Sequence, residues 1–249
     1  MAEQNVISIN DVFKQYKNAI EPTVNGISLD IFKGEVFGLL GPNGAGKTTT
    51  ISMICGLLKP DSGSVAINDY DVQKNFERVK RDIGVVPQDL ALFETLSARE
   101  NLRFFGKMYG LDADMLNYRI DHFLEVFGLL GHASKRIKYF SGGMKRRINL
   151  IAALLHEPTI LILDEPTVGV DVQSRSVILN FLKKLNREGV TILYTSHLLE
   201  EAQDLCSRVA IIDRGTVLAK GVPQDLIDET ETNNLQGYFL HLTGENPRD

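Results

Sequence analysis

The chain has 249 residues, of which 43% are hydrophobic and 24% charged, a composition typical of a globular protein with enough material for a large core. Its formal net charge of -5 disfavours a protein that coats nucleic acid, because such proteins carry a basic surface. Residues 1–5 form no basic or apolar leader and no apolar run is long enough to cross a bilayer, so we expect a soluble, cytosolic domain with two buried free thiols, Cys55 and Cys206.

Short strands are predicted in the first third of the chain. Apolar and polar residues alternate over residues 6–9 and 27–31, and a turn at residues 60–63 leads into an apolar run at residues 65–67. We expect these segments to be antiparallel strands. Between them, residues 36–40 form an apolar strand, and a glycine-rich turn leads from this strand into a helix over residues 48–55.

The middle of the chain is predicted to be helical from about residue 90 to residue 155. Ser97 and Glu100 have the spacing of a capping box, in which each side chain satisfies the other residue's free backbone N–H. Apolar residues at steps of three and four mark one helix face between residues 116 and 127 and another between residues 148 and 155. This all-helical stretch predicts an inserted subdomain.

The last third returns to an alternation of strands and helices. Strands are predicted at residues 160–163, 190–196 and 209–213, and the turn at Arg214 and Gly215 leads into residues 216–218. This pattern indicates an α/β fold around a mainly parallel sheet. We expect residues 1–89 and 156–227 to form the core around the helical subdomain 90–155, followed by a linker at 228–234 and a short helix near 235–242 within residues 228–249.

A phosphate-binding motif, G-x-x-x-x-G-K-[ST], joins the strand at residues 36–40 to the helix that follows. It consists of Gly41, Pro42, Asn43, Gly44, Ala45, Gly46, Lys47 and Thr48, with Thr49 next to it. Backbone N–H groups of the loop can surround phosphate oxygens, Lys47 can reach the β- and γ-phosphates, and the Thr48 hydroxyl can ligate Mg²⁺. The glycine spacing differs from G-x-G-x-x-G and disfavours a nicotinamide-type cofactor.

Two carboxylates follow the apolar strand at residues 160–163. Asp164 stands where a P-loop NTPase holds Mg²⁺ through water. Glu165 is one residue further, where a carboxylate can polarise the attacking water. Because four apolar residues run directly into Asp-Glu-Pro in a chain with a P-loop, this interpretation is favoured over a pair of ordinary exposed acids.

A third motif comprises Phe140, Ser141, Gly142, Gly143 and Met144 and is similar to the signature motif L-S-G-G-Q of ATP-binding-cassette (ABC) transporters. Together with the P-loop and the Asp-Glu strand, it makes the chain resemble a nucleotide-binding subunit of that family over nearly its whole length. The resemblance implies an ATP hydrolase that uses ATP and Mg²⁺. It also implies a RecA-like P-loop core with an antiparallel β subdomain and a helical subdomain.

The resemblance further implies a dimer, either of two copies or of paired ABC subunits. In this family the signature segment covers the γ-phosphate held by a partner subunit, so two nucleotides lie between two head-to-tail chains. Ser141, Gly142 and Gly143 then form a second anion site at a helix N-terminus. Phe140 and Met144 replace the usual Leu and Gln, so the glutamine side-chain contact is absent while the backbone site remains.

Four further residues match family positions individually. Tyr16 resembles the aromatic residue that stacks on adenine, although alone it reads as a half-buried strand residue. Gln88 matches the glutamine that senses Mg²⁺ and water, and Asp171 matches the aspartate that crosses the dimer interface. His197 matches the histidine that contacts the γ-phosphate. The remaining histidines, which have no zinc-site spacing, read as ordinary residues: His122, His132, His156 and His241.

Three segments, residues 141–147, 164–171 and 238–244, resemble the ATPases of ABC-2-type exporters. That resemblance implies a separate transmembrane permease and a position on the cytoplasmic face of the membrane, with no direct contact to nucleic acid. Within the first segment, the run Lys145, Arg146 and Arg147 reads on its own as a solvated helix face.

Three other functions compete with this interpretation. A soluble ABC ATPase of translation or DNA repair usually carries two cassettes or a long coiled-coil insertion, and neither is visible in the sequence. A switch GTPase requires an N-K-x-D guanine motif, which is absent from the sequence. A non-hydrolysing clamp is disfavoured by the intact Glu165.

Overall fold

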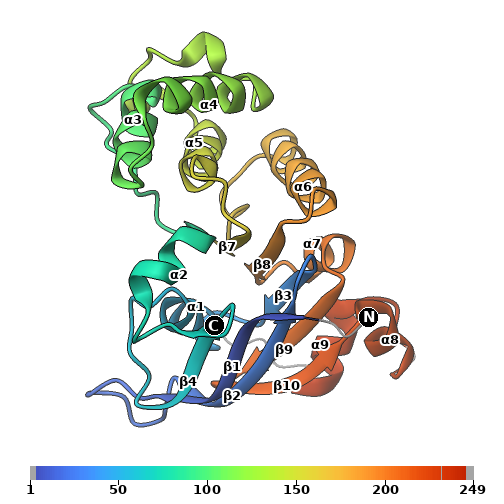
Figure 1. Ribbon diagram of the computed structural model, residues 1–249. Coiled ribbons are helices and arrows are strands. Elements are labelled where there is room, and N and C mark those ends of the chain that lie inside the picture. Colours follow the sequence, from blue (N-terminus) through green and yellow to red (C-terminus); the bar gives the residue numbers. More distant parts are fainter. Residues whose placement is uncertain (1–3, 231, 245–249) are drawn as a thin grey trace.

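The computed structural model describes residues 4–230 and 232–244. Three parts of the predicted segments lie outside the described residues: residues 1–3 of the N-terminal segment, position 231 of the predicted linker and residues 245–249 of the predicted C-terminal segment. The fold is built from two sheets and a group of helices that extends away from them (Figure 1).

The larger sheet carries the strands that border the predicted phosphate site. Its strands are β3 (Val36–Leu40), β6 (Ile83–Val86), β7 (Ile160–Asp164), β8 (Thr191–Ser196), β9 (Arg208–Asp213) and β10 (Thr216–Gly221). They are ordered β10-β9-β3-β8-β7-β6, and the neighbours from β9 to β6 pair in parallel while β10 pairs antiparallel with β9. The carboxyl ends of β3, β7 and β8 therefore meet at one edge, where α/β folds place their ligands.

The smaller sheet is antiparallel, as the alternating pattern of the first third predicted. Its strands are β1 (Asn5–Lys14), β2 (Val24–Phe32), β4 (Ser62–Ile67) and β5 (Tyr70–Asp71). They are ordered β2-β1-β4-β5. The fold-class prediction, an α/β P-loop core with an additional antiparallel sheet and helices, is confirmed.

Helices surround the larger sheet and continue beyond it. They are α1 (Lys47–Ile54), α2 (Phe76–Asp82), α3 (Ala98–Met108), α4 (Ala113–Val126), the 3-10 helices η1 (Leu130–His132) and η2 (Ile137–Tyr139), α5 (Gly142–Leu154), α6 (Val172–Arg187), α7 (Leu199–Leu205), α8 (Pro223–Asp228) and α9 (Leu235–Thr243). Helices α3, α4 and α5 lie at the top of Figure 1, opposite the antiparallel sheet at its bottom. We call α3, η1, η2, α4 and α5 the helical arm.

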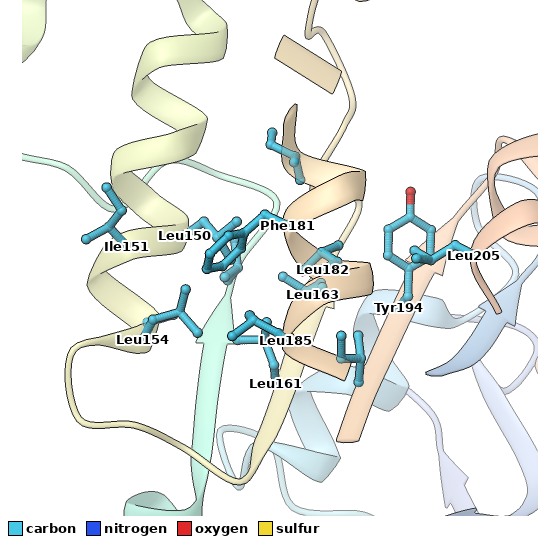
Figure 2. Packing of buried hydrophobic residues seen from close by; sticks show 14 of the residues in the cluster. Leu150, Ile151, Leu154, Leu161, Leu163, Phe181, Leu182, Leu185, Tyr194 and Leu205 are labelled. Carbon is cyan, nitrogen blue, oxygen red and sulfur yellow. The ribbon is translucent and has the colours of Figure 1, made fainter. Parts of the chain in front are cut away.

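The strand β7 separates two hydrophobic cores. Leu161 and Leu163 face the core beneath α5, α6 and the helical arm, whereas Ile160 and Ile162 face the core between α1 and the antiparallel sheet. Figure 2 shows side chains of α5 and α6 converging on β7 in the first of these cores. All four residues are at most 1% exposed, so the predicted strand buried on both faces is confirmed.

The helical arm begins later than the sequence predicted. Residues 87–97 form no regular helix, and α3 starts at Ala98 after the predicted capping box, in which Ser97 accepts from the Glu100 N–H and Glu100 accepts from the Ser97 N–H. The loop before it is fixed by Asn101, which accepts from the Phe93 N–H at 2.8 Å and donates to the Phe93 carbonyl at 3.0 Å. This side chain replaces backbone pairing that a helix would have supplied.

The C-terminal helix α9 packs into the main body. Leu235 and Tyr238 are 0% and 4% exposed and belong to the same core as α5 and α6. The Leu235 N–H also donates to Gln203 Oε1 of α7 at 3.0 Å. No helix within residues 4–230 and 232–244 combines the length and apolarity needed to span a membrane.

Candidate functional site

The predicted phosphate loop lies between the end of β3 and the start of α1. Gly46, immediately before α1, has φ of 104°, a left-handed conformation that favours glycine. A Cβ at this position would lie 2.5 Å from the Thr23 carbonyl oxygen. The last loop glycine is therefore required both by the backbone conformation and by the close approach of the neighbouring chain.

Lys47 is held inside this loop. Only 5% of the residue is exposed, and its Nζ donates to the carbonyls of Gly41 at 2.8 Å and Pro42 at 3.0 Å. The same Nζ lies 3.3 Å from Glu165 Oε1. A buried ammonium group at the N-terminus of a helix gives the loop a fixed positive charge suited to an anion.

Asp164 and Glu165 stand at the end of β7 and share a partner on β8. The Thr195 hydroxyl donates to Asp164 Oδ1 at 2.6 Å and accepts from the Glu165 N–H at 3.0 Å. Glu165 has φ of 48°, a left-handed conformation that costs roughly 1–3 kcal/mol for a residue with a side chain. The Thr195 hydroxyl thus helps to hold a strained backbone at the point where the chain leaves the sheet.

The carboxylate of Glu165 gathers three predicted site residues. Its Oε1 faces Lys47, while its Oε2 accepts from Gln88 Nε2 at 3.3 Å and lies 3.3 Å from His197 Nδ1. These partners come from α1, from the loop after β6 and from the end of β8, so the parallel sheet brings together residues that are far apart in sequence. Glu165 itself is 5% exposed.

A pocket of about 350 Å³ opens in front of this cluster. Its walls are the phosphate loop with the start of α1, the side chains of Gln88 and Glu165, and one residue that the sequence did not predict, Thr23. The lining residues are Thr23, Asn43, Gly44, Gly46, Lys47, Thr48, Thr49, Gln88 and Glu165. Thr23 precedes β2 and carries no motif, so only the fold reveals that it lies here.

The chemistry of the pocket fits a Mg²⁺–triphosphate. Lys47 and the N-terminus of α1 supply positive charge for phosphate oxygens. Thr48 and Gln88 line the pocket, whereas the predicted metal ligand Asp164 is 3% exposed and does not line it. The oxygen atoms of all three are the type of ligand that Mg²⁺ prefers. Within the described residues no group of three or more His, Cys, Asp or Glu could hold a metal ion. A Mg²⁺ ion here would therefore take its remaining ligands from phosphate and water, as is usual for this ion.

A second cavity of about 430 Å³ borders the phosphate loop. Gly41, Pro42 and His197 line it, but its other walls include Leu198 and Phe239 from the segments around α7 and α9. It lacks Lys47 and Thr48. The cation and the hydroxyl groups suited to phosphate therefore lie in the smaller pocket.

Tyr16 lies beside the phosphate loop. It follows the end of β1, is 47% exposed, and its hydroxyl is 3.5 Å from Thr49 Oγ1. The alternative interpretation of Tyr16 as a half-buried strand residue is wrong, because β1 ends at Lys14. An exposed ring at the rim of the loop is available for stacking on a flat base.

The signature segment forms the N-terminus of α5. Ser141 caps this helix by accepting from the Met144 N–H at 3.2 Å, and Ser141 and Gly142 are exposed. Gly143 is buried against α6, since a Cβ there would lie 2.6 Å from the Ser174 Cβ. None of the three lines the phosphate pocket of the same chain.

Asp171 caps α6. Its Oδ1 accepts from the Ser174 N–H at 2.9 Å, and this hydrogen bond is the main reason that the pKa of its carboxyl lies below the ordinary value. Its Oδ2 would lie 3.1 Å from a Cβ at Gly143, so the N-termini of α5 and α6 lie together. Sequence matching did not reveal this capping role.

The expectation of a solvated face at Lys145, Arg146 and Arg147 is wrong. Arg146 is only 7% exposed and donates to backbone carbonyls, and Arg147 is half-buried and donates to the Phe127 carbonyl at 2.9 Å. Lys145 pairs with Glu94 at 2.6 Å. Partners outside α5 hold these side chains, namely the Gln88 and Phe127 carbonyls and Glu94. This is a tertiary effect that a run of basic letters does not reveal.

The cysteines are buried free thiols, as predicted. Burial raises the pKa of Cys55 to about 12 and also raises that of Cys206. Thiols held in this state are poor nucleophiles, and neither lines the phosphate pocket.

Comparison with known proteins identifies the family. Residues 24–168 match the sequence profile of the family described as ABC transporter. The chain is 54% identical over 203 residues, 82% of its length, to the linearmycin resistance ATP-binding protein LnrL of Bacillus subtilis, of which it spans 65%. It is 41% identical to the Nod factor export ATP-binding protein I of Cupriavidus pinatubonensis, over 90% of this chain and 68% of that protein.

Solved structures share the same fold. One, described as an ATP-binding subunit of an ABC transporter, matches 96% of this chain and 99% of its own at 30% identity and a TM-score of 0.86. Another is a dimeric ATP-binding cassette in a post-hydrolysis state with ADP and Pi, matched over 87% of this chain and 98% of its own at 28% identity and a TM-score of 0.79. The chain therefore belongs to the ABC transporter family, as an ATP-binding subunit of the kind that hydrolyses ATP.

Proposed function

We propose that the smaller pocket binds ATP with Mg²⁺ and that this chain cleaves the terminal phosphate. The observation that carries the proposal is the convergence of Lys47, Gln88 and His197 on the carboxylate of Glu165 beside the phosphate loop. Loop N–H groups, Lys47 and Thr48 are assigned to the phosphates, Thr48, Gln88 and Asp164 to Mg²⁺, and Tyr16 to adenine. The bound ion supplies charge neutralisation at the phosphates.

In this mechanism Glu165 orients and polarises the attacking water. Its carboxylate faces Lys47 at 3.3 Å, and phosphate oxygens that enter the loop compete for the same ammonium group. His197 and Gln88 remain on the other carboxylate oxygen, where they can hold the water and the γ-phosphate in line. Catalysis then consists of positioning and charge stabilisation, with little covalent chemistry for the protein.

We also propose that two chains sandwich the nucleotides. The exposed N-terminus of α5, with Ser141 and Gly142, is an anion site that does not line its own chain's pocket, so it is free to face the pocket of a second subunit. The related cassette in a post-hydrolysis state is described as dimeric. Asp171 and Gly143 lie beside this surface and are assigned to the interface.

A membrane permease is the proposed partner of the helical arm, which places the chain at the cytoplasmic face of the membrane. Leu90, Phe93 and Phe104 are 37%, 45% and 44% exposed, and the two phenylalanine rings lie 4.9 Å apart edge to face. Met108, four residues after Phe104 on α3, is 70% exposed. An apolar surface beginning two residues after Gln88 can transmit movement at the nucleotide to the permease.

The direction of transport is proposed to be export. One relative is named for linearmycin resistance and another for Nod factor export. The names of these relatives do not favour a role in translation or DNA repair. We further propose that residues 1–227 act as one ATPase domain, with the helical arm inside residues 90–155, and that residues 228–249 form a C-terminal segment.

The decisive experiment uses Glu165→Gln in the full chain, with Glu188→Gln on the exposed end of α6 as the matched control. Glu165→Gln should bind ATP, lose hydrolysis by at least about a hundredfold and elute as a dimer in ATP but as a monomer without it. Glu188→Gln should hydrolyse ATP at the parental rate. Hydrolysis by Glu165→Gln at the parental rate would remove Glu165 from the mechanism, and a monomer in saturating ATP would contradict the sandwich.

The permease proposal is tested separately by Phe104→Asp. This change should reduce co-purification with a membrane protein from detergent-solubilised membranes and leave ATP affinity unchanged, because Phe104 does not line the nucleotide pocket. Co-purification with ribosomes or DNA would contradict the proposed partner.

A further inference from the structure

Arg146 joins three parts of the molecule that the proposed mechanism requires. It lies on α5, four residues after the helix begins, and is 7% exposed. Its Nη1 donates to the carbonyls of Gln88 at 2.7 Å and Pro87 at 3.2 Å, and its Nη2 makes a long hydrogen bond of 3.5 Å to the Val168 carbonyl. One guanidinium group therefore links α5 to the loop of Gln88 and to the loop after Glu165.

The position is costly, which indicates that it serves a purpose beyond packing. Burial lowers the pKa of the Arg146 guanidinium, and the carboxylates of Asp89, Asp164 and Glu165 partly counter this effect. The group nevertheless remains protonated, because arginine does not lose its proton in proteins. Among the described residues no carboxylate forms an ion pair with Arg146, so the buried charge relies on its carbonyl acceptors, and the two loops must keep their shape while Arg146 is in place.

The planar guanidinium suits this task better than a lysine ammonium group. Its N–H donors point in fixed directions, so carbonyls from two different loops can be held at a defined separation. A lysine at the same position would supply one flexible point charge and could satisfy only part of this set. An arginine at this position therefore fixes the distance between the loop of Gln88 and the loop of Val168, which a lysine would not.

We propose that Arg146 is a positioning residue that ties the N-terminus of α5, which carries the signature residues, to the loop of Gln88. The anion site that α5 offers to the partner subunit's nucleotide and the Gln88 side chain at the chain's own nucleotide then move as one unit. The inference rests on the proposed function. Its physical basis is the rigid path from Ser141 at the start of α5 through Arg146 to the Gln88 carbonyl. The Gln88 side chain in turn touches Glu165 Oε2.

The test compares Arg146→Met and Arg146→Lys with Arg119→Met. Arg119 is a matched control, since it also lies in the helical arm, is partly buried and donates to a backbone carbonyl, that of Leu155 at 2.7 Å, but touches neither loop. For the full chain we expect Arg146→Met to lower kcat by on the order of tenfold to a hundredfold with the ATP dissociation constant within about twofold of the parent. Arg146→Lys should recover part of kcat, and Arg119→Met should keep the parental kcat.

A second readout does not depend on hydrolysis. In nucleotide-free protein, amide hydrogen exchange over residues 86–92 and 167–170 should be at least about tenfold faster in Arg146→Met than in the parent and unchanged in Arg119→Met. If the parent itself fails to hydrolyse ATP, the proposed function is wrong, and the exchange data still decide the role of Arg146. If Arg146→Met does not fold, Arg146→Lys decides by the same two measurements.

Two results would overturn the inference. One is unchanged exchange in both loops with kcat equal to that of Arg119→Met. The other is that Arg146→Met and Arg119→Met lose kcat to the same extent and also lose ATP affinity to the same extent. That outcome would mean that either substitution destabilises the whole helical arm and that Arg146 has no specific positioning role.

Discussion

Thr195→Val removes the hydroxyl that connects the two carboxylate residues at the end of β7. Thr195 is 0% exposed; it donates to Asp164 Oδ1 at 2.6 Å and accepts from the Glu165 N–H at 3.0 Å. A hydrogen bond to a charged group contributes about 1.5–3 kcal/mol and a neutral one about 1 kcal/mol, so the substitution should lower the free energy of unfolding by about 3 kcal/mol. Valine keeps the β-branched shape that strand β8 accommodates.

Thr191→Val on the same strand is the control. Thr191 is 1% exposed and accepts one neutral hydrogen bond, from the Gly34 N–H at 2.9 Å. Its replacement should cost about 1 kcal/mol. Because both substitutions exchange the same hydroxyl for a methyl group on one strand, the gain in apolar burial is similar and cancels in the comparison.

The assay is urea unfolding without nucleotide, followed by ATP hydrolysis of the folded variants. Thr195→Val should be about 2 kcal/mol less stable than Thr191→Val, and only Thr195→Val should lose activity, since Glu165 then loses the acceptor that fixes its backbone. Equal free energies of unfolding for the two variants would refute the argument that Thr195 holds the carboxylate pair.

Lys47→Ala should weaken ATP binding by on the order of a hundredfold, measured with a fluorescent nucleotide, and unchanged affinity would disprove the phosphate-loop assignment. Gly143→Ala should lower the free energy of unfolding by about 1–3 kcal/mol in chemical denaturation, because the new Cβ would lie 2.6 Å from the Ser174 Cβ; parental stability would contradict this packing. Burial lowers the pKa of His156 below its ordinary 6.5, so the unfolded chain binds the proton more readily than the folded one. The contribution of neutral His156 to the free energy of unfolding is therefore complete above about pH 6.5 and is lost as the pH falls below it. His156→Phe should therefore flatten the loss of stability in urea unfolding between about pH 7.5 and about pH 5.5, and an unchanged pH profile would contradict this assignment.

The strands and the phosphate loop could be predicted because local sequence determines them. Residues 160–163 are apolar without alternation, and a strand between two cores is the arrangement that buries both sides. The loop from Gly41 to Lys47 carries a motif whose glycines and lysine have definite physical roles. Gln88 and His197 could be singled out only through family matching, and their contacts with Glu165 were not predicted, because these depend on the order of the parallel strands.

The rest of the site depends on tertiary packing. Thr195 reads in sequence as a strand residue, and only the neighbouring β7 makes its hydroxyl a partner of two carboxylate residues. Arg146 reads as one of three exposed cations, but the helical arm and the Gln88 loop enclose it. Thr23 has no motif at all. These residues have in common that their partners at the site lie at least 20 positions away, beyond the reach of local patterns.

The double burial of β7 limits how this segment can evolve. Ordinary surface strands expose every second residue and accept polar replacements there, but residues 160–163 offer no such position. A replacement at any of the four disturbs one core or the other, immediately next to Asp164 and Glu165. The strand that positions the two carboxylates therefore tolerates few substitutions. We expect sequence changes in this protein to accumulate in its loops and on its outer helix faces instead.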